Sequence, residues 1–386
     1  MKTRKLMIVA GEASGDGHGA KLVKALCNAE PDVNFEFFGC AGKLLRTAGV
    51  EAIVEADALS VVGVAEIGRV LPMFLRAFRD LKRAAVERRP DAVILIDFPD
   101  FNLKLAKSLN KQGLKVIYYI SPQLWAWRKY RIRSIRKYVD LLITILPFEK
   151  DWYASNGVTH VEYVGNPLAM EVHPTLSKSD FCERHGLDPD KPIVSLLPGS
   201  RHKEIVRILP VMLEASALIS AQRPEIQFVI AMASDKDRSD VQKAIASAKH
   251  RGLNTLKIVE SETYDALNAS DAAAIASGTA TLEAGIIGTP MVIVYNSSVL
   301  NYVLLKPLIS VEHYGLINLI AGERIAKEMI QNEFTSETLG NEILHLLEPK
   351  ENSSMRVCLK QAADKLGHGG ASNRAAEAIM RLIDTQ

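Results

Sequence analysis

A carboxylate at the end of an apolar run is the first feature with chemical meaning. Asp97 follows the apolar residues 92–96 and precedes Phe98, Pro99 and Asp100. Such a run is typical of a strand buried on both faces of a parallel sheet, and ligands bind at the carboxyl ends of these strands. Because an aspartate is rarely buried without a partner, Asp97 is either a cap on the following helix or a reacting group. Position alone leaves both interpretations open.

A glycine-rich turn, residues 11–19, follows the first apolar run. Its N–H groups suit a phosphate or another anion, with Glu12, Ser14, Gly15 and Asp16 as the candidate contacts. The alternative is a tight turn in which Asp16 caps the next helix. A partial match to a dinucleotide-binding fingerprint is weak, because no acid follows the second strand to hold a ribose.

Two further turns of this kind lie in the second half of the chain. Gly199, Ser200 and Arg201 follow one apolar run, and Ser277, Gly278, Thr279 and Thr281 follow another. Turns rich in N–H groups at neighbouring strand ends, with an arginine beside them, predict a diphosphate pocket. Glu283 then either stabilises the start of its helix or accepts hydrogen bonds from a ribose diol.

Residues 61–89 combine an apolar stripe with surplus positive charge. The simplest structural interpretation is a helix whose apolar stripe faces the core. The alternative is a patch that docks on anionic lipid, formed by Val64, Ile67, Val70, Leu71, Phe74, Leu75 and Phe78. A second basic segment, residues 128–137, follows an aromatic one. It resembles no RNA-binding module, so a surface for an anionic substrate is the favoured interpretation.

Short apolar runs alternate with helical patterns along the whole chain, which is typical of parallel sheets covered by helices. The 386 residues, 48% of them hydrophobic, suffice for two such domains. We expect an N-terminal domain over residues 1–168, a linker over 169–191, a second Rossmann-like domain over 192–350 and C-terminal helices over 351–386. We expect the α/β fold class, with two parallel-sheet domains that face each other across a cleft and C-terminal helices that pack back on the N-terminal domain or are swapped in a dimer.

Composition excludes several classes of protein. The net charge of +2 does not argue for nucleic acid, and the four cysteines have no metal-ligand or disulfide-framework spacing. The apolar run near the N-terminus is too short for a signal sequence or a membrane span. We therefore expect a cytoplasmic protein without a zinc site or a disulfide framework.

Seven segments, in order along nearly the whole chain, resemble the lipid-A-disaccharide synthase family of GT-B glycosyltransferases. They are residues 11–16, 96–102, 121–128, 146–149, 197–201, 277–283 and 318–322. The chain departs from the family pattern at Asn166, where members usually have histidine, and at Ile317, where many have proline.

The resemblance implies an inverting transfer of 2,3-diacylglucosamine from UDP to 2,3-diacylglucosamine 1-phosphate. The products would be a β-1,6-linked lipid A disaccharide 1-phosphate and UDP. It makes Asp97 the general base, and it places Glu283 and Asn318 with the two turns of the second domain in the nucleotide site. The resemblance also implies that the reaction needs neither a metal nor a cofactor. It also implies peripheral association with the inner membrane, and it allows a homodimer that exchanges C-terminal segments. The alternatives are another UDP-N-acetylglucosamine-dependent transferase or epimerase, and a non-catalytic sensor of UDP-sugars that docks on membranes.

Overall fold

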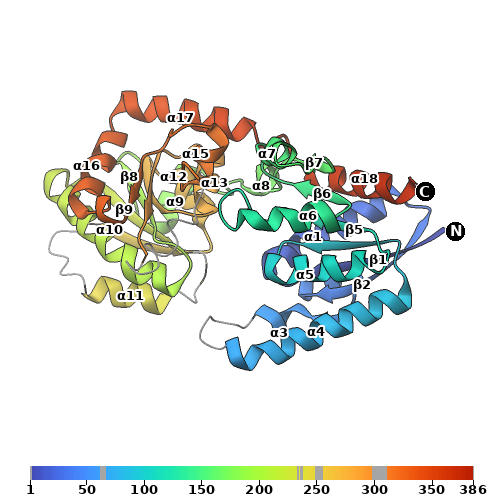
Figure 1. The fold of residues 1–386 in the computed structure, drawn as a ribbon. Coiled ribbons are helices and arrows are strands. Elements are labelled where there is room, and N and C mark those ends of the chain that lie inside the picture. Colours follow the sequence, from blue (N-terminus) through green and yellow to red (C-terminus); the bar gives the residue numbers. More distant parts are fainter. Residues whose placement is uncertain are drawn as a thin grey trace. The chain divides into compact units, whose positions relative to one another are not determined.

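A computed structural model of the chain describes residues 2–60, 67–232, 234, 238–247, 255–297 and 311–385. The chain divides into two compact units (Figure 1). The first comprises Met1–Pro167 and Gly369–Gln386, and the second comprises Leu168–His368. Each unit is built on one parallel sheet, as the alternation of apolar runs and helical patterns predicts.

The sheet of the first unit has the strand order β3-β2-β1-β4-β5-β6-β7. Its strands are β1 (Lys2–Ala10), β2 (Val33–Ala41), β3 (Glu51–Glu55), β4 (Ala92–Ile96), β5 (Val116–Tyr119), β6 (Leu141–Thr144) and β7 (Val161–Tyr163). The order changes direction between β1 and β4, which pair in register up to Ala10 and Ile96. A ligand site is expected at this switch point, beyond the carboxyl ends of the two strands.

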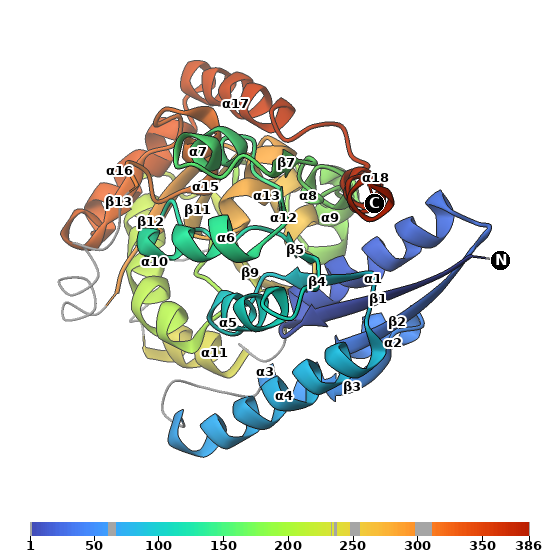
Figure 2. The ribbon, with the colours of Figure 1, turned by 45° about the vertical axis from the view of Figure 1, so that its right-hand side comes forward.

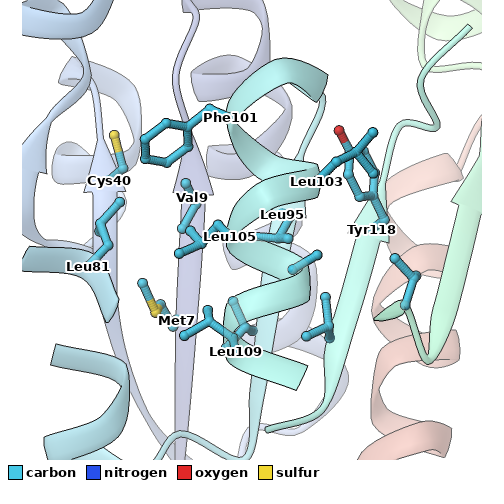
Figure 3. Close-up of a cluster of buried hydrophobic side chains, with 14 of the residues drawn as sticks. Met7, Val9, Cys40, Leu81, Leu95, Phe101, Leu103, Leu105, Leu109 and Tyr118 are labelled. Carbon is cyan, nitrogen blue, oxygen red and sulfur yellow. The ribbon is translucent and has the colours of Figure 1, made fainter. Parts of the chain in front are cut away.

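Helices cover both faces of this sheet. They are α1 (Ala13–Ala29), α2 (Lys43–Thr47), α3 (Ala56–Ser60), α4 (Ile67–Arg88), α5 (Pro99–Asn110), the 3-10 turn η2 (Lys129–Arg131), α6 (Ile132–Tyr138), α7 (Glu149–Ser155) and α18 (Ala371–Asp384). Alternate residues of β1 point to opposite faces. Met7 and Val9 join the core under α4 and α5 (Figure 3), whereas Leu6 and Ile8 join the core under α1 and α18.

The second unit repeats the plan with the strand order β10-β9-β8-β11-β12-β13. Its strands are β8 (Ile193–Leu197), β9 (Gln227–Met232), β10 (Leu256–Glu260), β11 (Ala272–Ala276), β12 (Met291–Tyr295) and β13 (Glu328–Ile330). Its helices are α8 (Leu168–Glu171), α9 (Lys178–His185), α10 (His202–Gln222), α11 (Arg238–Ser247), α12 (Thr263–Ala269), α13 (Ala280–Ile287), α15 (Leu316–Ala321), the 3-10 turn η5 (Gln331–Glu333), α16 (Ser336–Leu346) and α17 (Pro349–Asp364). Here the switch point lies between β8 and β11, which pair up to Leu197 and Ile275.

The segment expected as a linker, residues 169–191, is part of the second unit. Helix α9 packs against α12, and its Phe181 and Cys182 are fully buried. The Asp265 carboxylate fastens the preceding turn by accepting hydrogen bonds from the N–H groups of Thr175 and Leu176, at 2.6 and 2.8 Å. The two C-terminal helices belong to different units. Helix α17 packs against α13 and α15 of the second unit, whereas α18 packs against α1 of the first.

Candidate functional site

Asp97 directly follows β4, at the switch point of the first sheet, on an unusual backbone. Asp97 and Phe98 both have positive φ, 45° and 51°, a left-handed conformation that costs about 1–3 kcal/mol for each such residue. The Asp97 carbonyl accepts hydrogen bonds from Asn102 Nδ2 at 2.8 Å and from the Tyr118 hydroxyl at 2.6 Å. Its N–H donates to the Tyr119 carbonyl at 3.1 Å. Phe98 occupies the N-cap of α5, so the interpretation of Asp97 as a helix cap is wrong.

The turn after β4 also packs against the turn after β1. A side chain at Gly11 would lie 2.4 Å from the Phe98 ring, which explains the glycine. The same ring stacks on Phe74 of α4, with centroids 6.0 Å apart, and contacts Phe101 at 5.6 Å. The Asp97 turn is therefore fixed from both sides by aromatic packing and by hydrogen bonds.

The electrostatics of Asp97 suit a base. Burial raises its pKa to about 6, and the negative charge of Glu12 adds to the rise. The group is therefore mostly ionised at neutral pH, yet it binds a proton more readily than an exposed aspartate. Glu12, at the N-cap of α1, and Ser14, in the first turn of that helix, are exposed, whereas Gly15 is buried.

Asp16 does not serve this site. Its carboxylate is 4% exposed and accepts hydrogen bonds from the N–H groups of Gly42, Leu44 and Leu45, at 2.7, 2.8 and 3.2 Å. It thus caps the start of α2, 26 residues further on, and not the helix in which it lies, as the sequence suggested. The anion-binding role foreseen for residues 12–16 rests on the remaining members of the turn.

The second unit contains a pocket of about 290 Å³ at its own switch point. Among the residues that line it are Gly199, Ser200, Arg201, Ser277, Gly278, Thr279 and Glu283. Gly199 has a φ of 103°, and a side chain there would lie 2.4 Å from Glu204. Arg201 pairs with Glu204 at 2.9 Å but keeps 82% of its side chain exposed, so its guanidinium remains accessible to an anion.

Two predicted nucleotide residues have supporting positions and are not among those that line this pocket. Thr281 is fully buried and donates to the Gly278 carbonyl at 2.8 Å, which closes the turn. Asn318 is also fully buried; its amide bonds to the backbone of Ala326 in both directions and to Glu328 Oε1 at 2.8 Å. Because these partners hold the Asn318 side chain, Asn318 is not among the residues that line the pocket.

Glu283 reaches the pocket from the first turn of α13. Burial raises its pKa, although a hydrogen bond from the Tyr264 hydroxyl favours the ionised form. A half-buried carboxylate with one fixed donor can still accept hydrogen bonds from a diol. Within the described ranges, no three His, Cys, Asp or Glu side chains are grouped so as to hold a metal ion.

A buried carboxylate that the sequence did not single out anchors the loop after β5. Glu149 is 1% exposed and accepts hydrogen bonds from Trp125 Nε1 at 3.0 Å and from the Leu146 N–H at 3.1 Å. Burial raises its pKa to about 7. The Tyr153 hydroxyl donates to the Pro122 carbonyl at 2.7 Å. These contacts join two of the seven family-like segments, which is the signal from which Glu149 could have been inferred.

The apolar patch predicted on residues 61–89 divides into two parts. Leu71 and Leu75 of α4 are 56% and 54% exposed. Phe74 and Phe78 are instead half-buried against Phe101, at 6.1 and 5.9 Å, because they lie on the face of α4 that covers the sheet. Val64 lies outside the described residues, and only the backbone of Ile67 and Val70 is described. No described helix combines the length and the apolar character that crossing a bilayer requires.

Solved structures of low sequence identity share this fold over the whole chain. A putative UDP-N-acetylglucosamine 2-epimerase from Listeria monocytogenes has a TM-score of 0.67 at 18% identity, and the match covers 100% of this chain and 98% of that one. The calicheamicin glycosyltransferase CalG4 has a TM-score of 0.62 at 14% identity, with 100% and 99% covered. At such identities the likeness shows the fold alone, which is the GT-B fold.

Sequence relatives are more specific. The lipid-A-disaccharide synthase of Syntrophus aciditrophicus is 43% identical over 384 residues, 99% of either chain. That of Geobacter metallireducens is 42% identical over 381 residues, 98% of this chain and 97% of the relative. The family model described as lipid-A-disaccharide synthetase matches residues 6–382. These matches, which cover the strand ends that carry both candidate sites, establish that the chain belongs to the lipid-A-disaccharide synthetase family.

Proposed function

We propose that this glycosyltransferase of lipid A biosynthesis transfers 2,3-diacylglucosamine from UDP to the 6-hydroxyl of 2,3-diacylglucosamine 1-phosphate. The single observation that carries the proposal is the Asp97 carboxylate, half-buried at a switch point with a pKa of about 6. A base of this pKa is ionised at neutral pH and accepts a proton as the hydroxyl attacks.

The proposed step is a single displacement. The acceptor oxygen forms a bond to the anomeric carbon of the donor and gives its proton to Asp97. The bond between that carbon and the diphosphate oxygen breaks, and UDP leaves with the electron pair. Because the α-linked donor is attacked from the opposite side, the product is β-linked.

The pocket of the second unit is the proposed site for UDP. Arg201 offers a planar cation, and the turns at Ser200 and at residues 277–279 offer N–H groups to the leaving diphosphate. Glu283 would accept hydrogen bonds from the ribose hydroxyls. Asn318 would act indirectly, since it braces Glu328, whose carboxylate accepts from the N–H groups of Tyr314 and Gly315.

Membrane docking is part of the proposal, because both substrates carry acyl chains. The exposed Leu71 and Leu75 lie on the same helix as Arg76, which is 81% exposed. Apolar side chains with a basic flank favour the surface of an anionic bilayer. The protein would therefore collect its substrates from the cytoplasmic leaflet of the inner membrane.

Replacement of Asp97 tests the assignment of the base. We expect Asp97→Asn to lower the rate of transfer by about 10²–10⁴-fold, the usual contribution of a general base. UDP binding, measured by calorimetry, should be unchanged, because the proposed nucleotide pocket lies in the other unit. Asp151→Asn, which changes an exposed acid of the first unit, is the matched control. Unchanged turnover in Asp97→Asn would remove Asp97 from the mechanism.

Substrate dependence separates this proposal from its alternatives. UDP release should require both the UDP-diacyl sugar and the lipid monosaccharide phosphate. Turnover of UDP-N-acetylglucosamine without a diacyl substrate would identify a different transferase or an epimerase. Binding of UDP without any release of it from the diacyl donor would identify a sensor.

A further inference from the structure

Two arginines of the first unit converge on one exposed carboxylate. Arg128 Nη1 lies 2.9 Å from Asp100 Oδ1, and the Arg131 guanidinium donates to the same oxygen. Asp100 has 66% of its side chain exposed, whereas Arg128 and Arg131 have 35% and 14%. Among the described residues, Asp100 is the only carboxylate that forms an ion pair with either arginine. The cluster therefore carries a net positive charge that is partly shielded from water.

The arginines are held by their surroundings. Arg128 has a φ of 54°, and its guanidinium lies over the Trp127 ring, 4.4 Å from the centroid. The loop that carries Trp127 is anchored below the surface by the bond from Trp125 to Glu149. Guanidinium groups that are held in place lose little entropy on binding, and their planar N–H groups match two oxygens of a phosphate.

The cluster lies beside Asp97. Asp100 is in the first turn of α5, which starts directly after the Asp97 turn. Burial raises the pKa of the Tyr118 hydroxyl, which bonds to the Asp97 carbonyl; the charges of Asp97 and Asp100 add to the rise, and that of Arg131 opposes it. The proposed base and the two arginines therefore both lie at the start of α5.

The chemistry of the proposed acceptor matches this arrangement. In a hexopyranose, the carbon that bears the anomeric phosphate and the carbon that bears the C6 hydroxymethyl group both flank the ring oxygen. The phosphate and the reacting hydroxyl therefore project from the same edge of the ring, and a phosphate site is needed about one sugar width from the base. We propose that Arg128 and Arg131 bind the anomeric phosphate of the acceptor, an inference that rests on the proposed function.

The donor carries a diphosphate and the acceptor carries an anomeric phosphate, so the effect of each arginine can be measured on each substrate separately. Transfer is measured with the acceptor and with the same diacylglucosamine lacking its phosphate, for the wild-type protein, Arg128→Ala and Arg131→Ala. With the phosphorylated acceptor, each substitution should raise the acceptor KM by about tenfold to a hundredfold, as expected for a charged hydrogen bond. The KM of the UDP-sugar should not change. With the dephosphorylated acceptor, wild-type protein and variants should react equally.

Controls separate binding from folding. Arg133→Ala removes an exposed cation of the same segment that is not one of the two ion-pair partners of Asp100, and it should behave as wild type. Arg131→Lys keeps the charge and should restore part of the acceptor affinity. Equal losses with both acceptors would overturn the phosphate site and indicate a structural role. Absence of any transfer by the wild-type protein would instead contradict the proposed function.

Discussion

The carboxylate of Asp97 is tuned by its neighbours. Burial and the charge of Glu12 both raise its pKa, to about 6. A base must be ionised before it accepts a proton, so on the proposed mechanism activity depends on the fraction of Asp97 that has lost its proton. If Asp97 is the base that we propose, the acidic side of the pH profile reports on this residue and on the charge of Glu12.

The pH dependence of kcat/KM should show this coupling. We expect activity to fall as the pH drops through about 6, because protonated Asp97 cannot act as a base. Glu12→Gln removes a like charge, lowers the pKa of Asp97 and should move the fall in activity to lower pH. Glu55→Gln, at an exposed acid of the same unit, is the control. An unmoved acidic limb in Glu12→Gln would show that another group controls it.

Removal of the Tyr118 hydroxyl tests whether its hydrogen bond positions the Asp97 turn. Tyr118→Phe removes the 2.6 Å bond to the Asp97 carbonyl and should lower kcat by roughly tenfold or more through misalignment, with little change in the acceptor KM. The free energy of unfolding should fall by only about 0.5–1.5 kcal/mol. Tyr119→Phe, at a buried tyrosine on the opposite face of the sheet, should leave kcat unchanged. A rise in KM without loss of kcat would argue against positioning.

At the scale of elements, α4 connects a surface to the site. One face carries the exposed Leu71 and Leu75, and the other places Phe74 on the Phe98 ring next to Asp97 (Figure 2 shows α4 beside β3). A helix that docks on a bilayer through the first face would thus hold the Asp97 turn close to the lipid surface. In that arrangement the acyl chains of a substrate could stay in the bilayer while its sugar reaches the proposed base.

Vesicle binding measures this role. A leucine that passes from water into hydrocarbon contributes about 1.5–3 kcal/mol, so Leu71→Ser and Leu75→Ser should each weaken binding to anionic vesicles by about tenfold or more. Leu44→Ser, which changes a 52% exposed leucine on α2, should not. Sedimentation with vesicles of phosphatidylglycerol gives the affinity. Equal binding by all three variants would place the docking surface elsewhere.

The elements that sequence predicts best are those buried on both faces. All residues of β4, β8 and β11 are buried, so the length and the ends of each strand can be read from its apolar run in the sequence. β3 escapes prediction because it begins and ends with exposed glutamates, and β13 because it has only three residues. Asp97 and the turns that line the pocket directly follow such strands, so their positions at the strand ends could be predicted. The roles of Asp16 and Asn318 could not, since their partners lie on separate elements.

At the scale of the whole molecule, the last helix belongs to the first unit. Ala375, Ile379 and Ile383 of α18 are buried in the core beside α1. The connection to α17 contains Gly367, Gly369 and Gly370, all with positive φ. Glycines allow such a connection to take other paths at small cost, so the same helix could cover the same face of a second copy.

Light scattering tests this exchange. We expect the full chain to give the mass of a dimer, with α18 exchanged between copies. Ile379→Ala, which removes buried contacts of α18, should weaken the dimer and cost about 2–5 kcal/mol of stability. Glu377→Ala, at an exposed position of α18, should do neither. A monomer mass for the wild-type protein at every concentration would contradict the exchange.

The position of α18 also fixes the order in which the protein can be completed during synthesis. The first unit leaves the ribosome early, but one face of its sheet keeps exposed apolar residues until Gly369–Gln386 emerge. The second unit is one continuous stretch, Leu168–His368, and can close its core as soon as it has emerged. The unit that contains Asp97 is therefore the last to finish folding, and a ribosome that stops before α18 releases a protein in which the proposed UDP pocket is complete but the Asp97 unit is not.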